Sequence, residues 1–309
     1  MDWSFAIAEA QARIAPHIRR TPVILADLPG LPEMELKLEH LQHTGSFKPR
    51  GAFNTLLSRP VPAAGVVAAS GGNHGAALGH AARALGYPAR IFVPELAGPA
   101  KIALIRATGA DLTVVPGVYD NALAAARAHE AETGALQVHA FDAPATVVGQ
   151  GTLFAEWEDQ GLSADTVLIA VGGGGLIGGA AAWLGTRRRI IAVEPANAPT
   201  LNRALAEGPE TEVAVSGVAA NALGARKIGR IGYDLCREAN VTSVLVADQD
   251  ITAAQALLWR ALRQWVEPGG ATALAALNSG VYRPEPGERI AVLVCGANPA
   301  PDPLAETQD

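Results

Sequence analysis

The sequence is poor in cysteine. Among its 309 residues only Cys236 and Cys295 are cysteines, and neither belongs to a C-x-x-C pair. Two isolated thiols cannot build the disulfide framework that stabilises small secreted proteins. We therefore predict a protein of the reducing cytoplasm.

Long apolar segments are also absent. No apolar run approaches the roughly 20 residues that a membrane-spanning helix needs, so we expect no membrane partner. The N-terminal stretch MDWSFAIAEAQARIAPHIRR contains acidic residues and lacks a long apolar core. It predicts an amphipathic helix instead of a secretory signal.

Basic residues are few and dispersed. The formal net charge is −6, and the arginines are scattered apart from the run Arg187, Arg188 and Arg189. A protein that binds nucleic acid normally carries a clustered basic surface. The composition therefore excludes nucleic acid as an expected partner.

Apolar residues, in contrast, are plentiful. With 49% hydrophobic and 17% charged residues, the chain is typical of a globular protein of about two domains. The predicted strand and helix pairs are GVVAAS with HGAALGHAARALG, ARIFVP with GPAKIALIRATG, DLTVVPG with YDNALAAARAHEAETG, and ADTVLIAVGGGG with LIGGAAAWLG. Continuous apolar strands separated by helices predict an α/β fold of parallel sheets covered on both faces. Ligands of such sheets bind at the carboxyl ends of the strands.

Three more strands are expected further along the chain. They lie in RRIIAVEP, SVLVAD and RIAVLVCG, and a helix from about Ile251 to Trp265 separates the last two. The tail ANPAPDPLAETQD is rich in proline and is expected to fray.

Four consecutive glycines, Gly172 to Gly175, stand between a predicted strand and a predicted helix. Glycine adopts backbone conformations closed to other residues, and it leaves successive N–H groups free to bind one anion. The loop predicts a phosphate site, with a tight strand-to-helix turn as the alternative. A dinucleotide site also stays open, because Glu194 stands near the spacing of an acidic ribose ligand.

A second glycine-rich loop, ASGGNHGAA, also joins a strand to a helix. Ser70, Asn73 and the exposed amides are suited to a carboxylate or a ring hydroxyl. The alternative is a Ser or Asn that caps the helix on a glycine turn. His74 taken alone is more often structural or solvated than catalytic.

Lysine is the scarcest charged residue, with four lysines against twenty arginines. A surface lysine loses nothing by mutation to arginine, but an amine that forms an imine cannot be replaced by a guanidinium. Lys48, in GSFKPRGAFN, is the candidate, and a partly apolar pocket beside Arg50 would disfavour its ammonium form. A solvated surface lysine is the alternative.

Together these three features suit pyridoxal 5′-phosphate (PLP) and an amino acid. In order along the chain, GSFKPRGAFN, SGGNHGAALGHAA, VGGGGLIGG, VEP, VEPGGATALAAL and VLVCGAN resemble the motifs of fold type II PLP enzymes, specifically the serine/threonine dehydratase and serine racemase group. The resemblance runs from about Thr21 to Asn298.

The resemblance implies a tryptophan synthase β-like fold of two parallel-sheet α/β domains, with the cofactor in the cleft between them. The large PLP-binding domain would comprise residues 1–64 and 143–309, and the small substrate-closing domain residues 65–142. It also implies a homodimer and a small-molecule amino-acid substrate.

The resemblance further implies a role for each matching residue. Lys48 would be the Schiff-base lysine, Phe47 a wall against the cofactor ring, and Asn73 the partner of the 3′-hydroxyl. Cys295 would face the pyridine nitrogen, and Glu267 would lie near the cofactor behind the residues that touch it. The phosphate would be held by Gly172, Gly173, Gly174, Gly175 and Leu176. The substrate carboxylate would be held by Ser70, Gly71, Gly72, Asn73 and His74.

A neutral thiol at the ring nitrogen weakens the electron sink, so elimination fits better than transamination. We expect L-threonine or L-serine to be converted to the 2-oxo acid and ammonia. Alternatives are a serine racemase, a 3-hydroxyaspartate dehydratase that would use Arg226 or Lys227 for the second carboxylate, and a catalytically silent PLP or amino-acid binding protein.

Two positions depart from the group's pattern. Racemases have a second serine where this chain has Gly71, which disfavours racemisation. The group's cation site matches Glu194 and the Ala198 carbonyl, but Thr200 stands at the Asp position. Because hard cations prefer several carboxylates, we predict no tightly bound metal, with Glu194 and Ala198 as the residual candidate. His40 and His43 lack a third ligand and are expected to be packing or surface residues.

Overall fold

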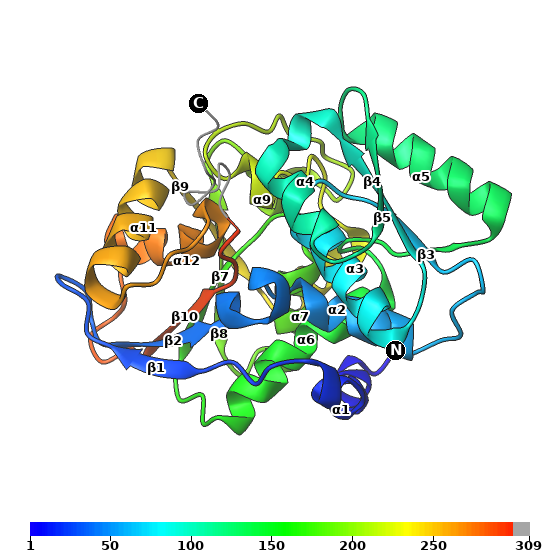
Figure 1. The fold of residues 1–309 in the computed structure, drawn as a ribbon. Helices are drawn as coiled ribbons and strands as arrows, with labels where there is room; N and C mark the ends of the chain where they lie inside the picture. Colours follow the sequence, from blue (N-terminus) through cyan, green and yellow to red (C-terminus); the bar gives the residue numbers. More distant parts are fainter. Residues whose placement is uncertain (299–309) are drawn as a thin grey trace.

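The computed structural model describes residues 1–298, which form two β-sheets flanked by helices (Figure 1). The strands are β1 (Val23–Ala26), β2 (Met34–Leu38), β3 (Val66–Ala69), β4 (Ala89–Pro94), β5 (Asp111–Val115), β6 (Leu136–Gln137), β7 (Thr166–Ala170), β8 (Arg189–Pro195), β9 (Thr242–Val246) and β10 (Ile290–Val294). The α-helices are α1 (Trp3–Ile14), α2 (Lys48–Leu57), α3 (Asn73–Leu85), α4 (Pro99–Arg106), α5 (Tyr119–Thr133), α6 (Pro144–Asp159), α7 (Gly175–Leu184), α8 (Thr200–Glu207), α9 (Ala220–Leu223), α10 (Arg230–Glu238), α11 (Asp248–Leu262) and α12 (Pro268–Asn278). The short 3-10 helices are η1 (Ala15–His17), η2 (Glu39–Leu41), η3 (His43–Gly45) and η4 (Glu95–Ala97). Of the predicted frayed tail, residues 299–309 lie outside the described residues.

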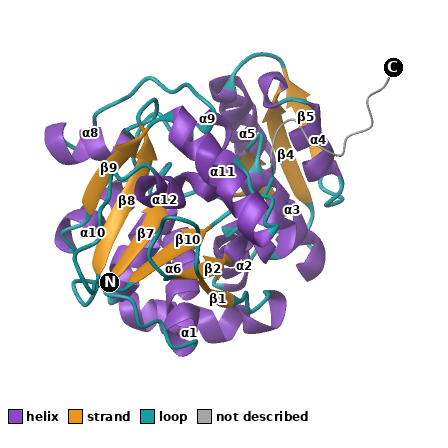
Figure 2. Cartoon of the chain, turned by 90° about the vertical axis from the view of Figure 1, so that its left-hand side faces the viewer, coloured by secondary structure: helices purple, strands orange, loops and turns teal. Residues whose placement is uncertain are grey.

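The larger sheet combines strands from both ends of the chain. Its order is β1-β2-β10-β7-β8-β9, and Figure 2 shows β7, β8 and β9 side by side. β2 runs parallel to β10, with Met34 opposite Ile290 and Leu38 opposite Val294. The residues that follow β2 and β10 therefore leave the sheet at the same edge, which brings the lysine motif next to the VLVCGAN motif.

One strand pair differs from the predicted parallel arrangement. β1 pairs with β2 in the antiparallel sense, with Val23 opposite Lys37. Only residues 27–33 connect the two strands, which is too short for the crossover that a parallel pair requires. Gly30 turns the chain there with a φ of +79°, a conformation that suits glycine.

The smaller sheet has the order β5-β4-β3-β6 and is parallel throughout. Successive residues of a strand face opposite sides, and β3 is buried on both. Val66 and Ala68 join the core under α3, whereas Val67 and Ala69 join the core under α5. This confirms the prediction of apolar strands covered on both faces. The domain boundaries at residues 65 and 142 stay a prediction.

Helices also cover both faces of the larger sheet. α12 packs on β7, β8, β9 and β10, and α11 packs outside it. On the other side α6 and α7 pack closely against each other. Gly179 allows this contact, because a Cβ there would lie 2.6 Å from the backbone nitrogen of Gly151.

The predicted N-terminal amphipathic helix is α1. Ile7, Ala10 and Ile14 are buried, at helical spacing, against α6 and α2. Asp2 caps the helix by accepting a hydrogen bond from the Phe5 amide at 3.1 Å.

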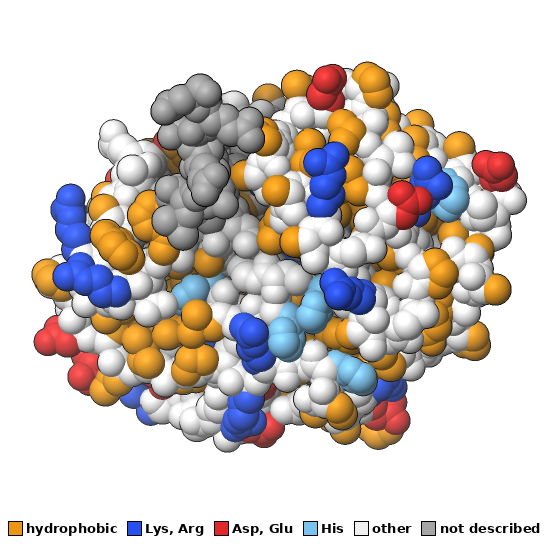
Figure 3. All heavy atoms as spheres, viewed as in Figure 1, with side chains coloured by type: hydrophobic (Ala, Val, Ile, Leu, Met, Phe, Trp, Pro, Cys, Tyr) orange, Lys and Arg blue, Asp and Glu red, His pale blue; other side chains and the backbone are white. Residues whose placement is uncertain are grey.

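The surface agrees with the dispersed charge expected from the sequence. On the face seen in Figure 3, Lys and Arg side chains are scattered and form no continuous stripe. Within residues 1–298, no helix combines the length and the apolar character needed to cross a bilayer.

Candidate active site

Lys48 opens helix α2 and is held close to the end of β10. Thr44 and Gly45 turn the chain with φ values of 57° and 71°, and Gly45 accepts a backbone hydrogen bond from Ala297 at 2.8 Å. The amide of Phe47 donates to the Cys295 carbonyl at 3.2 Å. These contacts place the lysine motif and Cys295, 247 positions later in the chain, side by side.

The Lys48 amine points toward the loop between the two sheets. Nζ donates to the Ala140 carbonyl at 2.8 Å and lies 5.0 Å from the centre of the Phe47 ring. Burial lowers the pKa of Lys48 to about 8, although the nearby Cys295 and Glu267 oppose the shift. A larger share of the amine is therefore neutral and nucleophilic near neutral pH than in an exposed lysine.

A cluster of buried polar side chains surrounds the end of β10. The Cys295 thiol contacts the Gly269 carbonyl at 3.5 Å, and burial, with Glu267 nearby, raises its pKa to about 12. Cys295 is therefore a neutral thiol near pH 7. Burial also raises the pKa of Glu267 to about 7, against the hydrogen bond from Asn73 and the charges of Lys101 and Lys48.

Asn73 links the smaller sheet to this cluster. It is the first residue of α3, its Nδ2 donates to Glu267 at 2.6 Å, and its Oδ1 accepts from Asn298 at 2.9 Å. The predicted loop residue and the predicted Glu267 thus make direct contact. Their two motifs lie 194 positions apart in the sequence.

Ser70 and His74 use their side chains to hold the loop. Ser70 Oγ accepts from the amides of Gly72 at 3.3 Å and Gly75 at 3.0 Å. His74 is buried, with Nε2 at 2.9 Å from the Val138 carbonyl, and burial followed by the charge of Lys48 lowers its pKa to about 3. The amides of Gly71, Asn73 and His74 donate to no acceptor within residues 1–298, so the loop offers backbone N–H groups rather than side chains.

Gly71 has a steric reason to be glycine. A Cβ at this position would lie 2.6 Å from the Cβ of Ala97, closer than side chains pack. The serine found here in racemases would therefore require Ala97 to move.

The tetraglycine loop forms a cradle of free amides. It joins β7 to α7, and Gly174 has a φ of +94°. The amides of residues 172–176 donate to no acceptor among the described residues. The first amides of a helix have no acceptor within the helix, and they commonly bind anions. A Cβ on Gly173 would overlap the ring of Phe141, next to the Ala140 carbonyl that binds Lys48.

Four buried charges hold the first turn of α2 in place. Arg50 lies 2.6 Å from Glu39 and 3.0 Å from Glu156, and Lys37 lies 2.6 Å from Glu156. We call Lys37, Glu39, Arg50 and Glu156 the buried quartet. The quartet contains two positive and two negative side chains, so its net charge is zero. Each charge has an oppositely charged partner, without which its burial would be unfavourable. Because Arg50 stands two residues after Lys48, the quartet fixes the base of the lysine.

Sequence reasoning missed Lys101. This lysine of α4 is only 5% exposed, and its Nζ donates to the Asn221 carbonyl at 2.6 Å. Burial lowers its pKa, opposed by Glu267. The scarcity of lysine that drew attention to Lys48 was the one available signal, and it applied equally to Lys101.

Other candidates lie apart from this cluster. Glu194 accepts from the amides of Leu201 at 2.6 Å and Asn202 at 2.8 Å and from Ser243, so it caps α8. The Ala198 carbonyl accepts from the Thr200 amide. The oxygens of the residual metal candidate are therefore used within the protein.

The candidates for a second carboxylate, Arg226 and Lys227, and the predicted packing or surface residues His40 and His43 each contact another side chain. Arg226 pairs with Glu212, and Lys227 pairs with Glu210, and all four side chains are exposed. His40 is buried and contacts Gln264 at 2.8 Å. His43 stacks on His80 with ring centres 4.8 Å apart.

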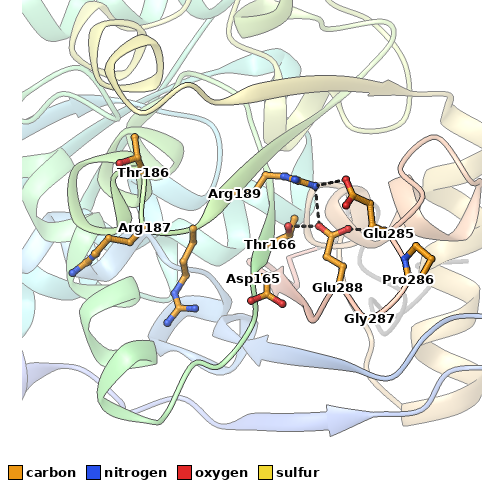
Figure 4. Close-up of a pocket in the computed structure, with 10 residues that line it drawn as sticks. Asp165, Thr166, Thr186, Arg187, Arg189, Glu285, Pro286, Gly287 and Glu288 are labelled. Atoms are coloured by element: carbon orange, nitrogen blue, oxygen red, sulfur yellow. Dashed lines mark hydrogen bonds and ion pairs between the residues drawn. The ribbon is translucent and has the colours of Figure 1, made fainter.

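A hollow of about 450 Å³ lies at the other edge of the larger sheet (Figure 4). It is lined by Thr166 and Arg189, the first residues of β7 and β8, whereas Lys48 and the tetraglycine loop lie near the carboxyl ends of the strands. Arg189 pairs with Glu288 at 3.3 Å and Glu285 at 3.6 Å. Arg187 and Arg188 pair with Glu158, so each charge of the arginine run has a carboxylate partner.

The residues around Lys48 fit the cofactor implied by the motifs. The tetraglycine amides suit a phosphate, the neutral Cys295 thiol suits a pyridine nitrogen, and the Lys48 amine suits an aldehyde. All three lie at the carboxyl ends of the strands of the larger sheet or in the turn beside them.

Comparisons with known proteins agree with this fit. A family model described as "Pyridoxal-phosphate dependent enzyme" matches residues 14–296. The chain is 36% identical to a phenylserine dehydratase of Ralstonia pickettii, over 95% of this chain and 92% of the relative. It is also 36% identical to an L-threonine ammonia-lyase of Geobacter sulfurreducens, over 94% of this chain and 74% of the relative.

The fold is likewise similar to solved structures. Maize serine racemase superposes with a TM-score of 0.88 at 30% identity, covering 96% of this chain and 93% of that one. The predicted tryptophan synthase β-like α/β class is confirmed, as is the resemblance to the serine/threonine dehydratase and serine racemase group.

Proposed function

Because the chain belongs to the family of pyridoxal-phosphate dependent enzymes, we propose that it is an ammonia-lyase acting on L-threonine or L-serine. Its cofactor is PLP. In the proposed reaction the Cα–H and β-C–O bonds break, and a proton and hydroxide leave as water. The resulting enamine takes up water and yields the 2-oxo acid and ammonia.

The observation that carries this proposal is the pairing of Lys48 with a neutral Cys295. When bound, PLP supplies an aldehyde for the amino group and a ring that withdraws electrons from Cα. A thiol with a pKa near 12 leaves the ring nitrogen without an acidic partner. This limits the electron sink and favours loss of a β-hydroxyl over transamination.

Lys48 is proposed to act as the base. With a pKa near 8, its amine is close to the range in which a group can both take and return a proton near neutral pH. Lysine is needed at this position because arginine stays protonated. Phe47 would lie against the cofactor ring and Asn73 at its 3′-hydroxyl.

The two glycine loops are proposed to bind the two anions. The tetraglycine amides with Leu176 would hold the phosphate, and the amides of the loop from Ser70 to His74 would hold the substrate carboxylate. The steric conflict of a side chain at Gly71 with Ala97 supports elimination over serine-type racemisation.

The alternatives make different predictions. A 3-hydroxyaspartate dehydratase needs a cation for a second carboxylate, and the pairing of Arg226 and Lys227 with surface carboxylates argues against these two residues in that role. A catalytically silent binding protein would retain its biological effect after Lys48→Ala.

The test is 2-oxo acid release by the PLP-loaded protein. L-serine, L-threonine, D-serine, threo-3-hydroxyaspartate and phenylserine form the substrate panel, the last because one relative is a phenylserine dehydratase. We expect release from L-threonine or L-serine that disappears in Lys48→Ala. If the 2-oxo acid is released only from another member of the panel, the proposed substrate is wrong and the proposed lyase activity stands.

We also propose that the protein is a homodimer. The proposal is supported by its resemblance to the serine/threonine dehydratase group. Light scattering coupled to size-exclusion chromatography should give twice the mass of one chain, and a monomer mass at micromolar concentration would contradict it.

A further inference from the structure

Lys101 is a buried lysine without a carboxylate at ion-pair distance among the described residues, although the charge of Glu267 opposes the lowering of its pKa. The other lysines are accounted for, since Lys37 pairs with Glu156, Lys227 pairs with Glu210, and Lys48 occupies the candidate site. Within residues 1–298, Lys101 makes no ion pair, and one carbonyl accepts its single hydrogen bond. An ammonium has three donors, and burial of such a charge is unfavourable unless it is paired.

Lys101 lies between the two glycine loops. Its Nζ is 3.5 Å from the position that a Cβ on Gly72 would occupy, so it borders the loop from Ser70 to His74. Its acceptor, the Asn221 carbonyl, belongs to α9. Leu223, in the same helix, packs on Gly172 of the tetraglycine loop. A Cβ on Gly172 would lie 3.0 Å from the Cα of Leu223.

The other charges around this point leave room for an anion. His74 is neutral because its pKa is near 3, and Glu267 already accepts a hydrogen bond from Asn73. A ligand carboxylate beside the free amides of Gly71 and Asn73 would accept the remaining N–H groups of Lys101. Hydrogen bonds to charged groups in water-poor surroundings are among the strong ones.

We propose that Lys101 binds the α-carboxylate of the amino-acid substrate, together with the loop amides, and thereby selects amino acids over their uncharged analogues. The inference rests on the proposed binding of an amino acid at this site. It does not depend on which bond is broken afterwards.

The test compares L-serine with L-serinamide, which lacks the carboxylate charge. Binding of each to the PLP-loaded protein is measured by titration from the absorbance of the bound cofactor. In Lys101→Met the dissociation constant for L-serine should rise about tenfold or more, with less than about a twofold change for L-serinamide. Lys227→Met, which removes a surface lysine, is the matched control and should change neither.

A structural role gives a different pattern. If Lys101→Met weakens both ligands equally, or leaves the preference for L-serine intact, the proposal is wrong. Lys101→Gln keeps a donor for the Asn221 carbonyl without the charge and should reproduce the loss of selectivity. Thermal unfolding of each apoprotein shows whether the variant is folded.

The same samples separate this inference from the proposed reaction. The 2-oxo acid is assayed independently of the absorbance. Loss of carboxylate selectivity without any product from the wild type supports Lys101 and rejects the lyase. Product from a Lys101→Met protein that still prefers L-serine over L-serinamide supports the lyase and rejects Lys101.

Discussion

His74 and Lys48 titrate far from their usual ranges because the protein removes water from around them. For His74 the folded protein disfavours the proton down to about pH 3, whereas the unfolded chain binds it below about pH 6.5. The unfolded state therefore binds more protons in this window. The stability of the protein is therefore unaffected by protonation of His74 above pH 6.5, and it decreases as the pH falls from 6.5 toward 3.

We predict that His74→Gln flattens this dependence. Between pH 5 and 6, His74 should lower the free energy of unfolding by about 1.4 kcal/mol per pH unit on acidification. Glu194 and Glu267 have pKa values raised to about 7, so the folded protein binds their protons more readily than the unfolded chain. Between pH 7 and 4.5 these two groups therefore increase the free energy of unfolding on acidification, opposite to His74. Hence the slopes of wild type and variant must be compared. Urea unfolding at several pH values measures both, and parallel curves would contradict the assignment.

Gly71 offers a second test at the scale of one residue. Gly71→Ser should lower the free energy of unfolding by about 1–3 kcal/mol, because the new Cβ meets Ala97 at 2.6 Å. The double variant Gly71→Ser/Ala97→Gly should recover most of that loss. Urea unfolding of the three proteins checks this. Equal stability of wild type and Gly71→Ser would show that the contact relaxes without cost.

The residues that the motifs singled out lie together in the structure, and their roles toward the cofactor stay predictions. The structure brings Lys48, Phe47, Cys295, Asn73 and Glu267 together as expected. Lys101 lies in no motif that we could interpret, and the role proposed for it rests on contacts such as that with Asn221, 120 positions away. Contacts of this kind arise from tertiary packing, which neither spacing nor composition encodes.

Helix α2 depends on the buried quartet. Arg50→Met removes the partner of Glu39 and one partner of Glu156 while retaining a side chain of similar length. An uncompensated buried charge typically costs about 3–5 kcal/mol, so we predict a loss of that size in the free energy of unfolding. Urea unfolding gives the value.

The matched control is Arg203→Met, which breaks the exposed pair of Arg203 with Glu207. Exposed pairs contribute little, and we expect a change below about 1 kcal/mol. Similar losses in both variants would mean that the quartet contributes no more than a surface pair.

At the scale of elements, the strand and helix pairs were predicted, whereas the short strands β1 and β2 were not. β1 and β2 have four and five residues, and their stretches VILA and MELKL carry too little periodicity to be recognised. The predicted helix from about Ile251 to Trp265 ends at Leu262, because Arg263 adopts a left-handed φ of 58°. Local backbone geometry of this kind overrides the helical pattern.

At the scale of the whole molecule, the site exists because distant segments meet. β10 lies between β2 and β7, so the carboxyl ends of strands from the start, middle and end of the chain share one edge. The alternation of strands and helices predicted parallel sheets, but it could not give their order. The strand order is what joins the lysine, tetraglycine and cysteine motifs into one site.

The central claim is that Lys48 holds the cofactor. The most direct measurement is borohydride reduction of the PLP-loaded protein, followed by mass mapping of the peptides that contain its four lysines. We predict that the pyridoxyl group is found on Lys48 alone and that Lys48→Arg carries none. Modification of Lys101 or Lys37, or an equally labelled Lys48→Arg protein, would contradict the account.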